Sequence, residues 1–231
     1  MSLPLFIHQN NRLSMALLCG VAFFFGYSVP NHYHLFEPQL LPLTELDRAI
    51  PFLPWSIFVY TSEYVLFVSA YFVYKEELNR NRYVWAYLGV LLVGMIFFVF
   101  FPTTYPRNDY PLPTDLHPLT YSIFAWLRNI DNPSNCFPSM HVACCFLTAF
   151  SFLPKSESRA TFWIYFVWAT LIALSTLPTK QHYVVDVLGG LVLSWLGYWV
   201  FFKKTRYIPL AEYATRIRAF SRSLLLREPR S

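Results

Sequence analysis

Residues 175–202 read STLPTKQHYVVDVLGGLVLSWLGYWVFF, a polar segment followed by a long apolar run. The run from 184 to 202 carries one acidic side chain, Asp186, near its start. A helix that crosses a bilayer needs about 20 predominantly apolar residues. The stretch therefore predicts a transmembrane helix, and it places His182 and Asp186 where that helix meets a polar loop.

The composition of the whole chain is typical of an integral membrane protein. The 231 residues are 55% hydrophobic and 13% charged, whereas soluble domains carry about 25% charged residues. We expect an all-α bundle of six transmembrane helices, forming one domain over residues 1–231 with a basic tail at 203–231. The first apolar run is flanked by a lone Arg12 without a small-residue cleavage site after it, which favours a retained span over a signal sequence. The five other runs cover residues 13–29, 55–74, 84–101, 140–153 and 160–177.

The distribution of positive charge predicts the orientation. With six spans both termini share one side, and fourteen of the 18 Lys and Arg residues fall there. Because basic loops remain in the cytoplasm, we expect cytoplasmic termini and place the loops 102–138 and 178–183 on the periplasmic or lumenal side. The tail suits anionic lipid headgroups, and a juxtamembrane cluster is a poor match for nucleic acid. Its basic residues are Lys203, Lys204, Arg206, Arg216, Arg218, Arg222, Arg227 and Arg230.

Two histidine motifs lie on the predicted outer side. In the first, CFPSMH at 136–141, Ser139 is a natural N-cap for the following apolar helix, so the N–H groups of Met140 and His141 are free to bind an anion. His141 could then give a proton to a leaving group. In the second motif, His182 and Asp186 are four residues apart and would share one face of a helix beginning there, where the carboxylate fixes the imidazole tautomer.

Further polar residues surround these motifs. Arg107 ends the stretch FPTTYPR, just past the third apolar run, and could clamp phosphate oxygens. Thr176 and Lys180 precede His182, and together these groups form an anion site with one nucleophile and one acid. Glu63 is a second acid within a predicted span and has no evident partner. It is either a proton-relay or substrate group, or a hydrogen-bonded structural residue.

Pro-Ser-Met-His followed by Ser-Thr-x5-His-x3-Asp resembles the type-2 phosphatidic acid phosphatase superfamily over about residues 101–190. The motifs look most like the branch that includes inositolphosphorylceramide synthases. The resemblance implies a six-helix bundle in which His182 forms a phosphohistidine, Asp186 orients it and His141 is the general acid. Ser139 and Arg107 would hold phosphoryl oxygens, and neither a metal nor another cofactor is implied.

The chain departs from the common family pattern at three positions. Met140 stands where the family usually has glycine, Thr176 where it has arginine, and Phe100 where it has lysine. Lys180 could replace part of the missing positive charge. The resulting prediction is a lipid phosphate phosphatase, and the alternative is a phosphotransferase that passes a phosphorylated headgroup to a lipid alcohol.

Two other classes were weighed, a zinc site built from His141, His182 and Asp186, and a non-enzymatic transporter or structural bundle. The zinc site is disfavoured because the chain places no further Cys or His ligand well. The transporter or structural bundle predicts that His182→Ala leaves function intact. The identity of the lipid and the oligomeric state are left open by the sequence.

Overall fold

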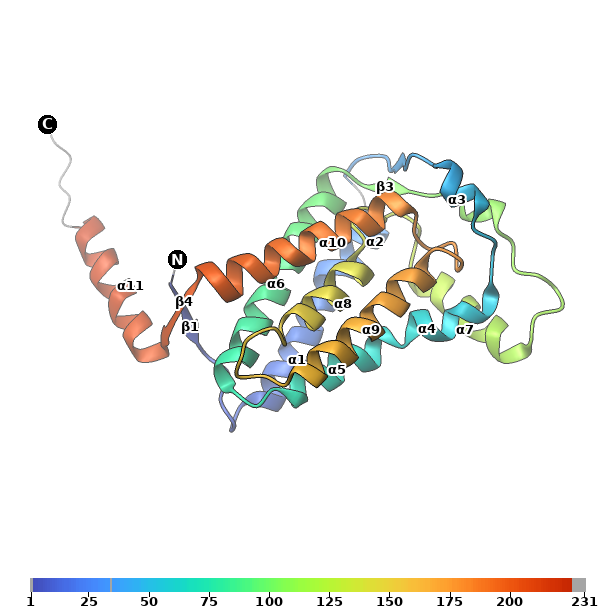
Figure 1. Cartoon of the computed structure of the whole chain (residues 1–231). Coiled ribbons are helices and arrows are strands. Elements are labelled where there is room, and N and C mark those ends of the chain that lie inside the picture. Colours follow the sequence, from blue (N-terminus) through green and yellow to red (C-terminus); the bar gives the residue numbers. More distant parts are fainter. Residues whose placement is uncertain (1, 34, 226–231) are drawn as a thin grey trace, which may run out of the picture.

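The computed structural model describes residues 2–33 and 35–225 and is mostly helical, with a bundle of long helices side by side (Figure 1). Short 3-10 and π-helical turns extend several of these helices. The bundle consists of α1 (Arg12–Phe23) with η1 (Phe24–Ser28) and α2 (Val29–His32), η2 (Pro54–Ser56) with α4 (Ile57–Thr61) and α5 (Glu63–Val73), α6 (Glu77–Phe100), α8 (Met140–Phe150), α9 (Arg159–Thr176), and α10 (Val184–Tyr198) with η4 (Trp199–Lys204).

Four helices of the described chain are long and apolar enough to cross a membrane. They agree with the predicted helical membrane class and coincide with four of the six predicted runs, while the count of six stays a prediction. The run at 140–153 forms α8, a helix of 11 residues, and the run at 160–177 forms α9, which has 18 residues and begins at Arg159. The four candidate spans are Arg12–His32, Pro54–Val73, Glu77–Phe100 and Val184–Lys204.

The short helix α8 is the centre of the bundle. Every residue from Met140 to Ala149 is buried, because α5, α6, α9 and α10 pack around it. Gly190 of α10 lies against the start of α8, where a Cβ on it would be 2.5 Å from the carbonyl oxygen of Ser139. Gly94 of α6 similarly accommodates the Met140 sulfur. The approach at Gly190 brings the starts of α8 and α10 together, and the approach at Gly94 packs α6 against the start of α8.

The loops at one end of the bundle build a cap over these helix starts (Figure 1). One element of this cap is α7 (Pro118–Ile130), whose Phe124 and Leu127 pack on Ile57 and Tyr60. The other elements of the cap are α3 (Glu45–Ala49), η3 (Arg107–Asp109), and the strand β2 (Gln39–Leu40), which pairs in parallel with β3 (Thr103–Thr104).

The opposite end carries the first and last elements of the described chain. There β1 (Ser2–Leu5) pairs in parallel with β4 (Arg206–Pro209), and α11 (Leu210–Leu225) stands apart from the bundle beside them (Figure 1). In the predicted basic tail, Lys203, Lys204 and Arg206 are exposed. Arg227 and Arg230 lie outside the described residues.

Candidate active site

His182 and Asp186 meet at the start of α10. The helix begins at Val184, so His182 lies in the loop just before it and not on the helix face that the spacing predicted. The two side chains nevertheless contact each other, with 2.8 Å between His182 Nδ1 and Asp186 Oδ2. The other carboxylate oxygen accepts a 2.8 Å hydrogen bond from the N–H of Tyr183. Both oxygens of Asp186 are therefore engaged, which fixes the carboxylate and the imidazole beside it.

The loop before His182 is held by the backbone of α9. The carbonyl of Thr176 accepts hydrogen bonds from the N–H groups of Gln181 and His182, both at 3.2 Å. The hydroxyl of Thr176 donates to the carbonyl of Ala173 within its own helix. Thr176 thus positions His182 through its main chain, and its predicted contact with phosphate stays a prediction.

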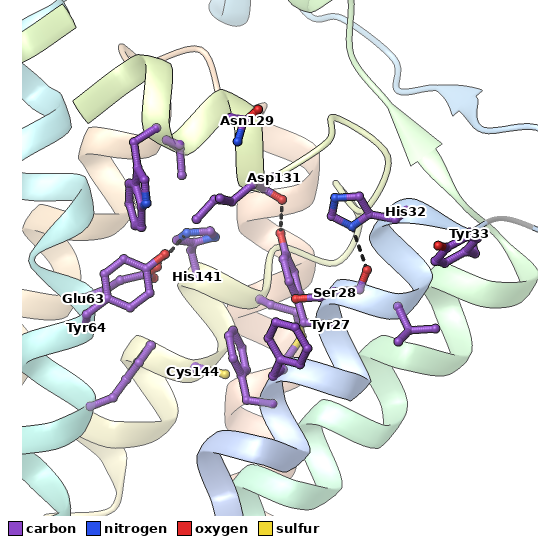
Figure 2. Close-up of a pocket in the computed structure, with 18 residues that line it drawn as sticks. Tyr27, Ser28, His32, Tyr33, Glu63, Tyr64, Asn129, Asp131, His141 and Cys144 are labelled. Carbon is purple, nitrogen blue, oxygen red and sulfur yellow. Dashed lines mark hydrogen bonds and ion pairs between the residues drawn. The ribbon is translucent and has the colours of Figure 1, made fainter. Parts of the chain in front are cut away.

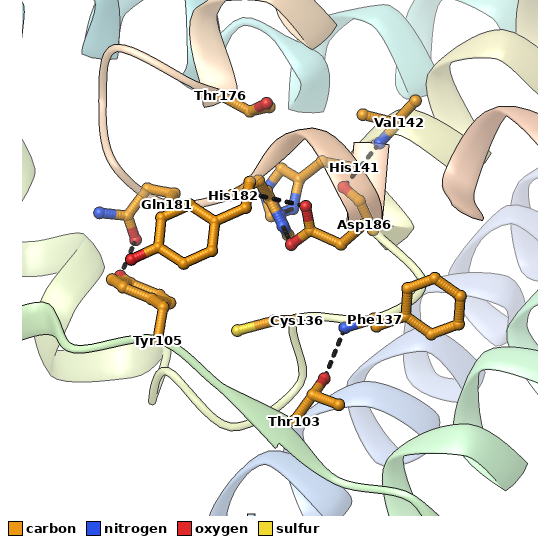
Figure 3. A network of polar contacts seen from close by, with 12 residues as sticks. Thr103, Tyr105, Cys136, Phe137, His141, Val142, Thr176, Gln181, His182 and Asp186 are labelled. Atoms are coloured by element: carbon orange, nitrogen blue, oxygen red, sulfur yellow. Dashed lines mark hydrogen bonds and ion pairs between the residues drawn. The ribbon is translucent and has the colours of Figure 1, made fainter. Parts of the chain in front are cut away.

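The first histidine motif begins α8 as predicted. Ser139 is the N-cap, and its Oγ accepts a 3.3 Å hydrogen bond from the N–H of Val142. Its own N–H donates to the carbonyl of Asp186 at 3.0 Å, which joins the two motifs directly. His141, one residue inside the helix, then faces His182 with 3.4 Å between its Nδ1 and His182 Nε2 (Figure 3). The structure therefore brings together both predicted histidines and the predicted aspartate.

The buried acid Glu63 has a partner that the sequence did not reveal. Its Oε1 lies 2.7 Å from His141 Nε2, an ion-pair distance although not an aligned hydrogen bond. The Glu63 side chain is 5% exposed and the His141 side chain 9%. Tyr60 was missed altogether, and its hydroxyl lies 3.4 Å from His141 Nδ1. An acid in an apolar run is a signal that points to Glu63, whereas one tyrosine among 16 carries no signal.

The motif at 101–107 lies against both histidine segments. Thr103 accepts from the N–H of Cys136 through its carbonyl, at 3.3 Å, and from the N–H of Phe137 through its hydroxyl, at 2.8 Å (Figure 3). Burial raises the pKa of the Cys136 thiol. Thr103 thereby fixes the segment that leads into Ser139, and the thiol beside it stays protonated at neutral pH.

Arg107 belongs to the same region. Its Nε donates to the Tyr105 hydroxyl at 3.0 Å and its Nη1 to the carbonyl of Arg128 at 3.2 Å. The Tyr105 hydroxyl donates in turn to Gln181 Oε1 at 3.0 Å. Arg107 is thus tied to the loop that carries His182 through one tyrosine and one glutamine.

Lys180 is used to hold the cap. Its Nζ donates to the carbonyls of Asp47, at 2.9 Å, and Ile50, at the end of α3, and lies 5.3 Å from the ring centre of Tyr110. Burial lowers the pKa of Lys180, and the nearby Asp47 carboxylate opposes that shift. Its φ of 54° lies in the left-handed region. The ammonium binds the carbonyl end of a helix, where positive charge is favourable, and its predicted role toward phosphate stays a prediction.

A cavity of about 840 Å³ opens beside His141. Figure 2 shows His141 and Glu63 on its wall, with Asp131 and Tyr27 across from them. Asp131 is held by the Tyr27 hydroxyl at 2.9 Å and by Asn31 Nδ2 at 3.1 Å. The wall is otherwise largely apolar and aromatic, with residues that include Phe23, Phe24, Tyr33, Tyr64, Phe67, Trp126, Leu127, Ile130 and Met140.

Within residues 2–33 and 35–225, no three or more His, Cys, Asp or Glu side chains are grouped as a metal site. His141 and His182 instead each contact one carboxylate, and their remaining nitrogens face each other. His182 contacts Asp186 through Nδ1 and leaves Nε2 available, whereas His141 contacts Glu63 through Nε2 and leaves Nδ1 available. The prediction that catalysis needs no metal is tested by chelation, below.

The sequence matches the family model of the PAP2 superfamily over residues 46–200. The chain belongs to that superfamily. An uncharacterized protein of Methanocaldococcus jannaschii, MJ0662, is 38% identical over 80 residues, which are 35% of this chain and 31% of that protein. The match thus spans about a third of the curated relative. The motif resemblance is confirmed at the level of the superfamily, which supports a phosphoester hydrolase or phosphotransferase, while the inositolphosphorylceramide-synthase-like branch stays a prediction.

Proposed function

We propose that the protein is a membrane phosphatase that hydrolyses lipid phosphates through a phosphohistidine on His182. The observation that supports this is the pair of facing imidazole nitrogens, His182 Nε2 and His141 Nδ1, 3.4 Å apart. Asp186 contacts the other nitrogen of His182 and so leaves the Nε2 lone pair available for attack. The rings must separate to admit a phosphoryl group, because in-line transfer puts attacking and leaving atoms on opposite sides of phosphorus.

In the first step, His182 Nε2 attacks phosphorus and the bond to the lipid oxygen breaks. The leaving oxygen takes the proton from His141 Nδ1 and departs as the alcohol. The phosphorylated imidazole of His182 is cationic, because Nδ1 keeps its proton, and the Asp186 carboxylate 2.8 Å away stabilises that charge. His141 ends this step neutral.

In the second step, water attacks the phosphoryl group and the N–P bond breaks. His141 Nδ1 takes the proton from water, so inorganic phosphate leaves and both histidines regain their initial states. The net reaction converts a lipid phosphate and water into a lipid alcohol and phosphate. No oxidant, reductant or metal takes part in this scheme.

We further propose that phosphoryl oxygens bind at the start of α8 and near Arg107. The N–H groups of Met140 and His141 lie in the first turn of α8, where backbone N–H groups have no carbonyl partner within the helix. A helix start of this kind favours anions. Ser139 caps that helix start, and Arg107 is linked through Tyr105 and Gln181 to the loop that carries His182. By contrast, the polar side-chain atoms of Thr176 and Lys180 are engaged elsewhere, so these two contribute less to the proposed phosphate site.

The cavity beside His141 supports a lipid substrate. A leaving alcohol must lie close to the group that protonates it, and His141 is part of the wall of the 840 Å³ space, which is otherwise largely apolar and aromatic. The same space could hold a lipid alcohol that replaces water in the second step. This keeps the phosphotransferase as the second candidate, because both reactions share the phosphohistidine.

The proposed topology has six crossings, with α8 and α9 completing the four candidate spans and both termini in the cytoplasm. The pairing of β1 with β4 supports an even number of crossings, because both lie at the end of the bundle opposite the histidine motifs (Figure 1). A reporter fused after residue 209 that is active only in the periplasm or lumen should be silent. An active reporter would show that the chain has the opposite orientation to the one proposed.

The test uses purified protein with phosphatidate labelled in its phosphate. We expect an acid-labile, base-stable label on the wild-type chain, absent from His182→Ala, and turnover that survives EDTA. Label released only as inorganic phosphate selects the phosphatase, whereas label on a second lipid selects the transferase. Turnover without any trapped phosphoenzyme would contradict the covalent mechanism, and loss in EDTA with recovery in zinc would replace it with metal catalysis.

A further inference from the structure

We propose that Glu63 is a positioning residue for His141. The general acid His141 then belongs to a second histidine–carboxylate pair, in which Glu63 orients His141 as Asp186 orients His182. This inference rests on the proposed function. Nothing in the histidine motifs includes Glu63, which lies on α5, a different helix from both. Its contact with the imidazole is what connects it to the reaction.

The geometry of the pair argues against a passive structural role. Glu63 lies in an apolar span, where a carboxylate is costly unless it meets a partner. Its Oε1 is 2.7 Å from His141 Nε2, and both side chains are nearly inaccessible to solvent. An imidazolium is the partner that balances this charge. The pair is therefore most stable with His141 protonated, the form that a general acid requires.

The contact also selects which nitrogen of His141 reacts. With Nε2 facing Glu63, the nitrogen that faces His182 is Nδ1. The proton on Nδ1 goes to the leaving oxygen in the first step, and the same atom takes a proton from the acceptor in the second. Nε2 keeps its proton beside the carboxylate throughout, so the ring holds one orientation in both steps.

Other ionisable groups around His141 are farther or already engaged. Tyr60 of α4 approaches the same Nδ1 at 3.4 Å, and Cys144 lies one turn further along α8. Asp131, after α7, is held by Tyr27 and Asn31. His182, in the loop before α10, and Asp186 on α10 are paired with each other. Glu63 is the carboxylate in direct contact with His141 among the described residues.

The test compares leaving groups in Glu63→Gln, which keeps the shape of the side chain and removes its charge. With phosphatidate, whose leaving alcohol needs a proton, kcat should fall about 10²-fold or more, within the range of general acid catalysis. With 4-nitrophenyl phosphate, whose leaving group departs unprotonated, kcat should fall less than about tenfold. The alkaline limb of the kcat profile with phosphatidate should move to lower pH. Glu63→Asp should recover part of the activity.

Glu157→Gln is the matched control, because Glu157 is also buried and accepts a hydrogen bond from Asn79. It should change the rates with both substrates to the same small extent. Equal losses with both substrates in Glu63→Gln, together with an unmoved alkaline limb, would overturn the inference and leave Glu63 as a packing residue. If wild-type protein turned over neither substrate, the proposed function itself would be wrong, an outcome distinct from the first.

Discussion

Replacing Gly190 with alanine would push apart the two helices that carry the candidate site. The added Cβ would lie 2.5 Å from the carbonyl oxygen of Ser139, 2.9 Å from Cβ of Val142 and 3.1 Å from the N–H nitrogen of Ala143. Two of these atoms belong to the α8 backbone, so they cannot rotate away. Moving the first contact from 2.5 Å to a tolerable 3.0–3.4 Å needs a displacement of about 0.5–0.9 Å.

This displacement acts directly on the reacting groups. His141 is two residues after Ser139, and His182 and Asp186 are fixed to the start of α10. A misplacement of about 1 Å can cost about 10²-fold in rate, so we expect kcat to fall by roughly 10–100-fold. Overpacking costs about 1–3 kcal/mol, and alanine regains about 1 kcal/mol of helix propensity. The net loss of unfolding free energy is then about 0–2 kcal/mol.

The assay is kcat with labelled phosphatidate in detergent micelles, with thermal unfolding measured on the same samples. Gly20→Ala is the matched control, because a Cβ at Gly20 of α1 meets nothing within 4 Å. It should leave kcat unchanged. Wild-type kcat in Gly190→Ala, with unfolding that shows a stable protein, would refute the view that the α8–α10 spacing sets the site.

Further predictions concern the charges of the site. Asp186→Asn should lower kcat by about 10²–10⁴-fold without unfolding the protein, because His182 loses the carboxylate that sets its tautomer; a near-normal rate would contradict the orienting role. The kcat profile should be bell-shaped, falling at low pH as His182 Nε2 gains a proton and at high pH as His141 loses one, whereas a rate that stays flat through both limbs would exclude the pair. Asp47→Ala should destabilise the chain by about 1–3 kcal/mol, as measured by thermal unfolding, because Asp47 completes the capping box of α3 and accepts from the N–H of Val184 at 2.8 Å. An unchanged unfolding temperature would show that the cap does not depend on Asp47.

The parts of the site that are local in the chain could be predicted from the sequence. Ser139 caps α8 because a short hydroxyl side chain directly precedes an apolar helix, an interaction that spans three residues. His182 and Asp186 meet because four residues separate them at a helix start. The run predicted from residue 184 coincides with the start of α10, so His182 lies just before the helix and not on its face, and Asp186 caps the N–H of Tyr183 at that point.

Contacts between helices could not be predicted in this way. Glu63 and His141 lie on α5 and α8, and their meeting depends on how these helices pack. The sequence predicts Lys180 as a cation near the phosphate site, but its backbone is left-handed and its ammonium donates to carbonyls in and after α3. The run at 140–153 is shorter than the about 20 residues that a spanning helix needs, and the structure shows that its helix α8 is the buried centre of the bundle.

The sequence by itself determined a helical membrane protein of the PAP2 superfamily, with two histidine motifs at helix starts, because hydropathy, capping and i, i+4 spacing are short-range properties. Tertiary structure alone decided that the two imidazoles face each other, that Glu63 contacts one of them, and that an apolar cavity opens beside that one. The physical reason is that these relations are set by the close packing of α8 against its neighbours at Gly190 and Gly94, where backbone approach, and not local propensity, fixes the positions of the side chains.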